Sequence, residues 1–178
     1  LGGSAEEVTL IGDSAGGNLA AAVSLMLRDK KGFCPRQQIL IYPATYNDHS
    51  EASPFASIRE NGEDYILTAK RVRDYLELYS AGRPENLHSP YFAPLVAEDL
   101  SRQPRTLVIT AEFDPLRDEG EAYAQKLKAH GNDVTLCRIP DAIHGFFTLP
   151  SRVPPVEESY RCINAFLAKG IEVKADEK

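Results

Sequence analysis

Thr9-Leu-Ile-Gly-Asp-Ser-Ala-Gly-Gly-Asn18 is the segment from which the architecture of this chain can be worked out. It continues a short, β-branched apolar run over residues 8–11, which predicts a buried parallel strand. Residues 17–30 are rich in Ala and Leu and predict a helix. Ser14 therefore lies in a very short turn between a strand and a helix. The pattern Gly-x-Ser-x-Gly in this context is typical of a nucleophile elbow, in which a strained turn raises the serine hydroxyl above the sheet.

Both glycines of the pattern, Gly12 and Gly16, are expected to be required, because strand and helix pass so close that a Cβ at either position would clash. The helix N-terminus also directs free N–H groups towards any negative charge that develops at Ser14. The alternative interpretation is a Gly-rich turn in which Ser14 only caps the helix. A catalytic role for Ser14 therefore requires a base and an acid elsewhere in the chain.

The composition indicates one globular domain and excludes several kinds of partner. The chain has 178 residues and a net charge of −6 without a basic block, which argues against nucleic acid and anionic membranes as partners. No apolar run approaches the roughly 18 residues of a membrane span. Cys34, Cys137 and Cys162 lack metal-ligand spacing, and their simplest interpretation is buried, reduced thiols in a cytoplasmic protein. No targeting signal is visible, although Leu1 does not look like a natural start.

Strands and helices alternate along the rest of the chain. Strands are predicted at residues 8–11, 38–43, 105–111 and 133–139, and helices at 17–30, 68–79, 115–130 and 154–169. This order predicts an α/β fold with a parallel sheet and right-handed crossovers. Gly170 is expected to end the last helix, and the charged residues 171–178 to be frayed.

Residues 44–105 differ from the rest because they are polar, rich in Pro and carry one clear helix, with Thr68 as its predicted N-cap. A segment of this length between two strands of one sheet is too long for a simple crossover. It is interpreted either as a cap over a pocket or as an ordinary crossover helix with long loops. Both interpretations remain open from the sequence.

Two further polar residues follow predicted strands. Asp114 lies three residues past Ala111, and His144 lies five residues past Ile139. Because ligands bind beyond the carboxyl ends of strands in open parallel sheets, both side chains are expected to lie near Ser14. The order Ser, Asp, His is the one that α/β-hydrolases use. In such a triad the Ser14 hydroxyl attacks an acyl carbonyl, His144 takes its proton, and Asp114 orients the imidazole.

Each partner of Ser14 also has a simpler interpretation. Asp114 followed by Pro115 is a favourable helix start, and His144 could be a surface loop histidine. Glu112 and Asp118 are rival acids, but Asp118 is expected to point away and Glu112 to face the opposite side from Asp114. The joint placement of three residues at strand ends, in the right order, favours the triad.

Three motifs resemble those of the hormone-sensitive-lipase-like α/β-hydrolases, a family that includes bacterial acetyl esterases and carboxylesterases. They are the nucleophile motif Gly12–Leu19, the acid motif Ala111–Gly120 and the histidine motif Ile143–Phe146. The resemblance implies a serine carboxylesterase that hydrolyses short-chain acyl esters through an acyl-enzyme on Ser14, with Asp114 and His144 completing the triad. It implies no metal and no cofactor. Tyr46, Phe146 and Phe147 are interpreted either as residues of the substrate pocket or as ordinary core residues.

The chain departs from this family in one important respect. The family carries a His-Gly-Gly-Gly stretch upstream of the nucleophile, and its N–H groups form most of the oxyanion hole. Here only the Ala15 N–H remains. Residues 1–178 therefore resemble the C-terminal portion of such an enzyme, a partial catalytic domain with four strands. Because loss of one oxyanion donor typically costs about 10²–10³ in rate, this portion alone is expected to be nearly inactive. Its first strand is expected to expose a hydrophobic edge prone to aggregation.

Alternatives of other classes remain. The chain could be a non-catalytic hydrolase-fold protein that binds a small ligand, although such relatives commonly lack the histidine. It could also be a peptidase or lactone hydrolase, because the fold alone does not fix the reaction. Family members often pair through the last strand, which leaves open a homodimer through Asp133–Ile139.

Overall fold

The computed structural model describes residue 4 and residues 7–175, with side chains to residue 169, and contains the predicted four-stranded parallel sheet. The strands lie in the order β1-β2-β3-β4, and every neighbouring pair is parallel. Their bounds are β1 Thr9–Asp13, β2 Gln37–Ile41, β3 Arg105–Phe113 and β4 Val134–Ile143. The predicted fold class is therefore confirmed.

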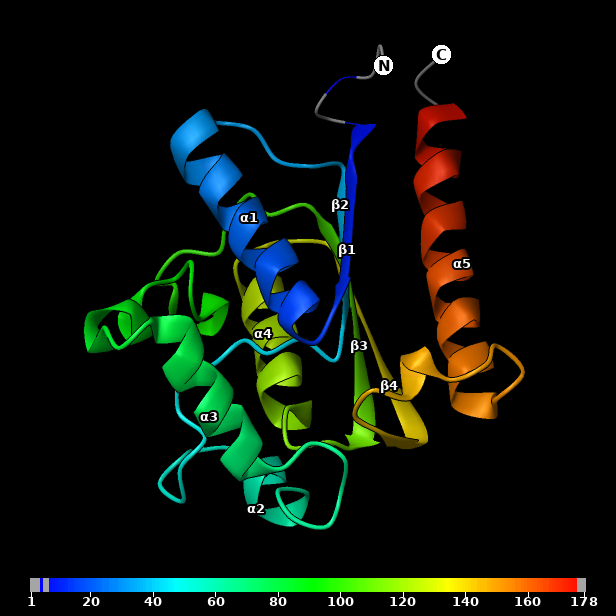
Figure 1. The fold of residues 1–178 in the computed structure, drawn as a ribbon. Helices are drawn as coiled ribbons and strands as arrows, with labels where there is room; N and C mark the ends of the chain where they lie inside the picture. Colours follow the sequence, from blue (N-terminus) through cyan, green and yellow to red (C-terminus); the bar gives the residue numbers. More distant parts are fainter. Residues whose placement is uncertain (1–3, 5–6, 176–178) are drawn as a thin grey trace.

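Helices cover both faces of this sheet (Figure 1). On one face α1 (Ala15–Lys31) and α4 (Arg117–Ala129) pack against β2 and β3, with Leu40 and Val108 in the core between them. On the other face α5 (Pro154–Ala175) packs against β3 and β4. Alternate residues of β2 point to the two faces, as the pleat requires, so Ile39 belongs to the core beneath α5.

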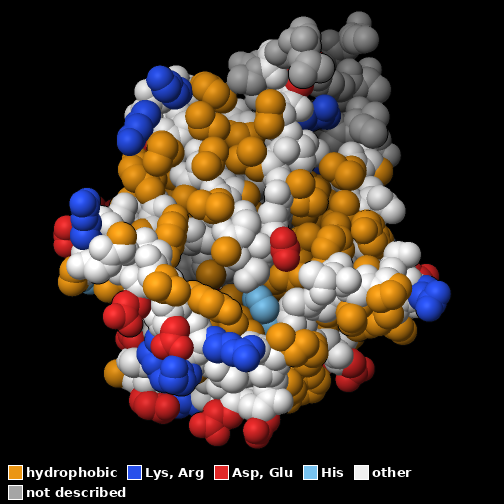
Figure 2. All heavy atoms as spheres, viewed as in Figure 1, with side chains coloured by type: hydrophobic (Ala, Val, Ile, Leu, Met, Phe, Trp, Pro, Cys, Tyr) orange, Lys and Arg blue, Asp and Glu red, His pale blue; other side chains and the backbone are white. Residues whose placement is uncertain are grey.

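The edge of β1 is exposed within the described part of the chain. β1 pairs only with β2 there, and α5 does not extend across it. As a result Ile11 is 57% exposed and Val8 46% exposed, and Leu19 and Val23 on α1 are also exposed. Figure 2 shows hydrophobic side chains gathered over α1 and along β1. The predicted hydrophobic edge is confirmed.

Two helix ends differ from the predictions. α1 begins at Ala15, two residues earlier than expected, so that Ser14 is its N-cap. Its predicted end is confirmed, because Gly32 adopts a left-handed conformation and donates its N–H to the Arg28 carbonyl at 3.2 Å. The predicted end of α5 at Gly170 is wrong, since the helix continues to Ala175. Residues 176–178 of the predicted frayed tail lie outside the described residues.

β3 and β4 are both longer than predicted, and their extra residues matter for the site. β3 continues two residues to Phe113 and β4 continues four residues through Pro140 to Ile143. The ladder is irregular between Ala111 and Phe113, after which Phe113 pairs with Ile143. Proline is tolerated because β4 is an edge strand of the described sheet, where a missing N–H breaks no inner ladder.

The insertion between β2 and β3 (residues 44–104) lies on the same side of the sheet as α1 and α4, near its carboxyl edge (Figure 1). It contains a short helix α2 (Ser57–Glu60), the longer α3 (Ala69–Ser80) and two 3₁₀ turns. Thr68 caps α3 as predicted, because its hydroxyl accepts the Arg71 N–H at 3.2 Å. Within the described ranges, none of the helices combines the length and the apolar character that crossing a membrane requires.

All three cysteines are free, as predicted, but they are partly rather than fully buried. Cys137 on β4 and Cys162 on α5 pack beside the core beneath α5. Burial, followed by the neighbouring Cys137 thiol, raises the pKa of Cys162 to about 12. The Cys162 thiol is therefore protonated at neutral pH and is a poor nucleophile.

We predict that Ile11→Lys reduces self-association of the 178-residue chain, because a charge at an unpaired hydrophobic edge opposes strand-to-strand pairing. Static light scattering at matched concentrations measures the effect. The control is Leu78→Lys, which changes a side chain that is 76% exposed on α3, far from the β1 edge. Equal scattering of wild type and Ile11→Lys, or an equal decrease in both variants, would contradict the prediction.

Candidate active site

Ser14 occupies a strained turn between β1 and α1. Its backbone has φ 52° and ψ −116°, a conformation with positive φ that non-glycine residues rarely adopt. Hydrogen bonds on both sides hold this conformation: the Ser14 N–H donates to the Ile41 carbonyl at 2.9 Å, and the Ser14 carbonyl accepts the Asn18 N–H at 3.0 Å. The neighbouring strand and the first turn of the helix therefore fix the serine together.

The glycines around Ser14 are not equally required. A Cβ on Gly12 would lie 2.2 Å from the Gly16 carbonyl oxygen, and one on Gly17 would lie 2.9 Å from the Pro43 Cβ. A Cβ on Gly16, in contrast, would meet only the Asp13 carboxylate at 3.9 Å. The prediction of a clash at both motif glycines is correct for Gly12 and wrong for Gly16. The close approach involves the Gly16 backbone, while its own Cβ position faces open space.

A continuous chain of hydrogen bonds joins the three predicted catalytic residues. Ser14 Oγ lies 2.9 Å from His144 Nε2, and His144 Nδ1 lies 2.7 Å from Asp114 Oδ2. The Asp114 side chain is fully buried and His144 is 8% exposed. The three side chains come from the ends of β1, β3 and β4, because Asp114 and His144 directly follow the paired residues Phe113 and Ile143. This geometry suits a nucleophile, a general base and an orienting acid.

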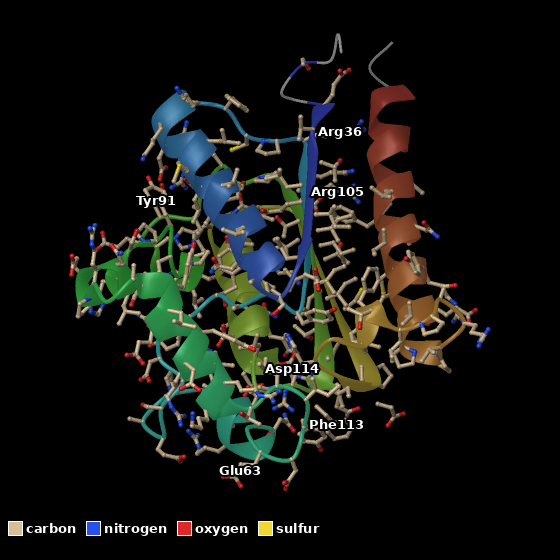
Figure 3. The ribbon with its side chains drawn as sticks, in the orientation of Figure 1. Arg36, Glu63, Tyr91, Arg105, Phe113 and Asp114 are labelled. Carbon is tan, nitrogen blue, oxygen red and sulfur yellow. The ribbon has the colours of Figure 1, made fainter. Side chains whose placement is uncertain are left out.

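Asp114 also organises the turn in which it lies. Its Oδ1 accepts the Leu116 N–H at 2.9 Å, and its backbone carbonyl accepts a bond from Asn61 Nδ2 at 3.4 Å. The bond that forms the turn and the contact with His144 thus use different oxygens of one carboxylate. Figure 3 places Asp114 at the carboxyl end of the sheet beside Phe113, opposite the end where Arg105 lies.

The rival acids contact other groups. Glu112 Oε2 accepts the Asp141 N–H at 2.8 Å, and Asp118 Oδ2 accepts the Ser57 N–H at 2.8 Å. Of the other histidines, His49 contacts Glu119, and His130 lies at the end of α4 with its Nδ1 2.8 Å from the Lys126 carbonyl. These contacts leave Asp114 and His144 as the partners of Ser14.

Tyr42 supports the imidazole and was not identified from the sequence. Its ring centroid lies 4.6 Å from that of His144, and its hydroxyl donates to Asp13 Oδ2 at 3.3 Å. Burial, followed by the charge of Asp13, raises the pKa of Tyr42 above its ordinary value, so the phenol stays neutral and continues to donate. The only signal in the sequence is an aromatic residue before Pro43 at the end of a strand.

A cavity of about 620 Å³ opens beside Ser14 and His144. Figure 2 shows this hollow between α1 and α3, surrounded by hydrophobic side chains. Besides Asn18 and Arg71, its lining is apolar or aromatic and comes from the start of α1, from the insertion with α3 and from the turn before α4: Ala15, Leu19, Ala44, Tyr46, Ile66, Leu67, Val72, Tyr75, Leu76, Tyr79, Phe92 and Leu116. The segment 44–104 therefore supplies one wall of the cavity. An apolar cavity with a few polar groups at one end is typical of small-molecule sites.

The predicted pocket residues have different outcomes. Tyr46 lines the cavity, whereas Phe146 is 2% exposed in the core beneath α5, with Phe147 packed against it. Ala15 also lines the cavity as the first residue of α1, where backbone N–H groups have no partner within the helix. Among residue 4 and residues 7–175, no group of three or more His, Cys, Asp or Glu side chains is arranged to hold a metal ion.

Comparisons with known proteins agree with this geometry. A protein-family model described as the α/β hydrolase fold matches residues 1–148. An arylesterase of Saccharolobus solfataricus is 38% identical over 151 residues, which cover 84% of this chain and 47% of that protein. An ethyl acetate hydrolase of Pseudomonas putida is 34% identical over 159 residues, which cover 89% of this chain and 48% of that protein.

Solved structures give the same result. A thermostable esterase from Pseudomonas putida ECU1011 has a TM-score of 0.79 at 35% identity, covering 88% of this chain and 49% of that one. An esterase from Pyrobaculum calidifontis has a TM-score of 0.79 at 36% identity, and the match covers 95% of this chain and 53% of that one. The chain therefore belongs to the α/β-hydrolase fold family. Within that family it is a member of the hormone-sensitive-lipase-like branch, and it spans about half the length of the relatives that it matches.

We predict that Gly12→Ala lowers the free energy of unfolding by about 3 kcal/mol, because the new methyl group must displace the backbone of α1. Gly16→Ala is the matched control, and it should be neutral or stabilising by about 0.5–1 kcal/mol, since Ala is the better helix former. Urea denaturation followed by circular dichroism measures both values. Equal destabilisation by the two substitutions would contradict the contact geometry of the turn.

Proposed function

We propose that this chain carries the nucleophile, base and acid of a serine carboxylesterase that hydrolyses short-chain acyl esters. The observation that carries the proposal is the hydrogen-bonded chain from Ser14 Oγ through His144 to Asp114. An apolar cavity opens beside Ser14, at the serine end of these hydrogen bonds, and an ester could bind there. The names of the similar proteins, an arylesterase and an ethyl acetate hydrolase, support the same substrate class.

The reaction follows from the positions of these groups. Ser14 Oγ attacks the ester carbonyl while His144 Nε2 takes its proton, and the Ala15 N–H donates to the developing oxyanion. Asp114 stabilises the imidazolium through Nδ1. The imidazolium then gives its proton to the departing alkoxide, which leaves an acyl-enzyme on Ser14. Water attacks this acyl group with His144 again as base, and the carboxylic acid leaves.

The size and lining of the cavity support a compact, apolar substrate. A volume of about 620 Å³ is within the range of small-molecule sites. The residues of α3 that line it are mostly apolar or aromatic, among them Val72, Leu76 and Tyr79, and Arg71 is the one charged residue of α3 in the lining. Short alkyl and aryl esters match this lining. Peptides and lactones are the alternative substrates, because the same scaffold can support their hydrolysis.

The proposal applies to a longer protein that includes the upstream region. The chain spans about half the length of its relatives, and Ala15 is its one proposed oxyanion donor. We infer that upstream backbone N–H groups complete the oxyanion hole, and that the chain alone is slower by about 10²–10³. A cytoplasmic location, a homodimer through β4 and the lack of nucleic-acid partners stay predictions from composition and family.

The test is turnover of a short-chain aryl ester by the longer protein. We expect Ser14→Ala to abolish turnover and Asp114→Asn to decrease kcat by about 10⁴, because an amide at this position favours the wrong tautomer of His144. Glu112→Gln is the matched control, since it makes the same carboxyl-to-amide change in a rival acid that does not contact His144.

Persistence of turnover in Ser14→Ala would reject the mechanism, and an equal loss in Asp114→Asn and Glu112→Gln would reject the assignment of the acid. A panel of peptides and lactones assayed beside the esters separates the carboxylesterase from the other hydrolases. The wild type is expected to prefer the esters.

A further inference from the structure

A second buried pair of charged side chains lies behind the cavity, apart from the triad. Glu119 on α4 is fully buried and His49 in the insertion is 1% exposed. The Glu119 Oε2 contacts His49 Nε2, while its Oε1 accepts the Thr45 N–H at 2.6 Å and the Tyr46 N–H at 3.0 Å. The Glu119 backbone carbonyl accepts the Thr45 hydroxyl at 3.0 Å. One buried carboxylate thus binds three groups from a segment about 70 residues away in the sequence.

The backbone that Glu119 holds forms part of the active site. Ala44 and Tyr46 line the cavity. The Ala44 carbonyl accepts a bond from Asn18 Nδ2 at 2.8 Å, and Asn18 lies on the first turn of α1. Thr45, between the two lining residues, is completely buried and bonded on both sides to Glu119. A shift of Glu119 would therefore move the cavity wall.

The pKa of His49 depends on its burial and on three nearby charged side chains. Burial, the largest influence, lowers the pKa of His49, but the charge and hydrogen bond of Glu119 outweigh it and raise the pKa above the ordinary 6.5. Asp48 also raises the pKa of His49, and Arg73, which donates to the His49 carbonyl at 2.9 Å, lowers it. His49 Nδ1 has no hydrogen-bond partner among the described residues, so Glu119 alone orients the ring.

We propose that Glu119 and His49 are positioning residues that hold residues 44–46 as the wall of the substrate cavity, and that this wall binds substrate best while His49 is protonated. The proposal deepens the esterase assignment and rests on it for its kinetic consequence. Neither side chain lines the cavity beside Ser14: Glu119 acts through the backbone of Thr45 and Tyr46, and His49 acts through Glu119. Their loss should therefore affect KM more than kcat.

The direction of the pH dependence follows from the raised pKa of His49. The imidazolium–carboxylate pair is complete below about pH 6.5, the value of an unperturbed histidine, and it is lost as the pH rises through the higher pKa of folded His49. Above that pKa the neutral imidazole can still donate from Nε2 to Glu119. This hydrogen bond is weaker, because the imidazole no longer carries a charge. KM should accordingly increase as the pH rises through this range.

The test compares two variants of the longer protein with wild type. Glu119→Gln keeps the size of the side chain and removes its charge, and we expect KM to rise about tenfold with kcat within about threefold. His49→Gln places a neutral amide donor near the Nε2 position, so KM should lose its pH dependence and stay near the value that wild type reaches above the pKa of His49. Glu121→Gln is the matched control on the same helix, because Glu121 pairs with Arg138 and does not line the cavity.

An NMR titration of the His49 ring tests the pair without any need for turnover, with the signal identified by its absence in His49→Gln. The ring should titrate above pH 6.5 in wild type and below it in Glu119→Gln, where burial, the largest influence, and Arg73 lower the pKa and Asp48 alone still raises it. An unchanged midpoint, an unchanged KM in Glu119→Gln, or an equal rise of KM in Glu121→Gln would overturn the proposal. Lack of ester turnover by wild type would reject the esterase assignment, and the titration would still decide whether the pair exists.

Discussion

The pairing of Phe113 with Ile143 is the constraint on which the site depends. It comes after an irregularity in the β3–β4 ladder, and it places the next residue of each strand, Asp114 and His144, side by side at the carboxyl edge of the sheet. A shift of one residue would turn one of the two side chains to the opposite face. The third partner, Ser14, lies at the same edge because β1 runs parallel to the other strands. β1 ends in a turn that brings the Ser14 hydroxyl to His144.

The first turn of α4, which directly follows the turn with Asp114, binds the insertion. Asp118 Oδ2 binds the Ser57 N–H, Arg117 binds Glu60 at 2.7 Å, and Glu119 binds the backbone at Thr45. Successive side chains at the start of α4 therefore anchor the segment that walls the cavity. The proposed acid Asp114 and the wall of the cavity are therefore positioned by one short stretch of sequence.

The sequence predicted the sheet and the order of its elements, and it singled out the three side chains that the structure joins by hydrogen bonds, because apolar runs, glycines and polar residues after strands are local signals. It placed the ends of β3 and β4 too early, since neither the ladder irregularity nor an edge strand that tolerates Pro140 is visible in a local pattern. The clash expected at Gly16 required the direction of a Cβ, which is a property of the folded turn. The pairing of His49 with Glu119 could not be predicted, because it arises only when the insertion folds back on α4.

Covalent labelling measures whether Ser14 is a nucleophile that His144 activates. The 178-residue chain and its longer form are incubated with a serine-reactive phosphonate, and peptide mass spectrometry locates the adduct. The geometry predicts one adduct, on Ser14, in both forms, with slower labelling of the shorter chain and none after His144→Ala. An adduct on another serine, or equally fast labelling of Ser14 without the imidazole, would contradict the account.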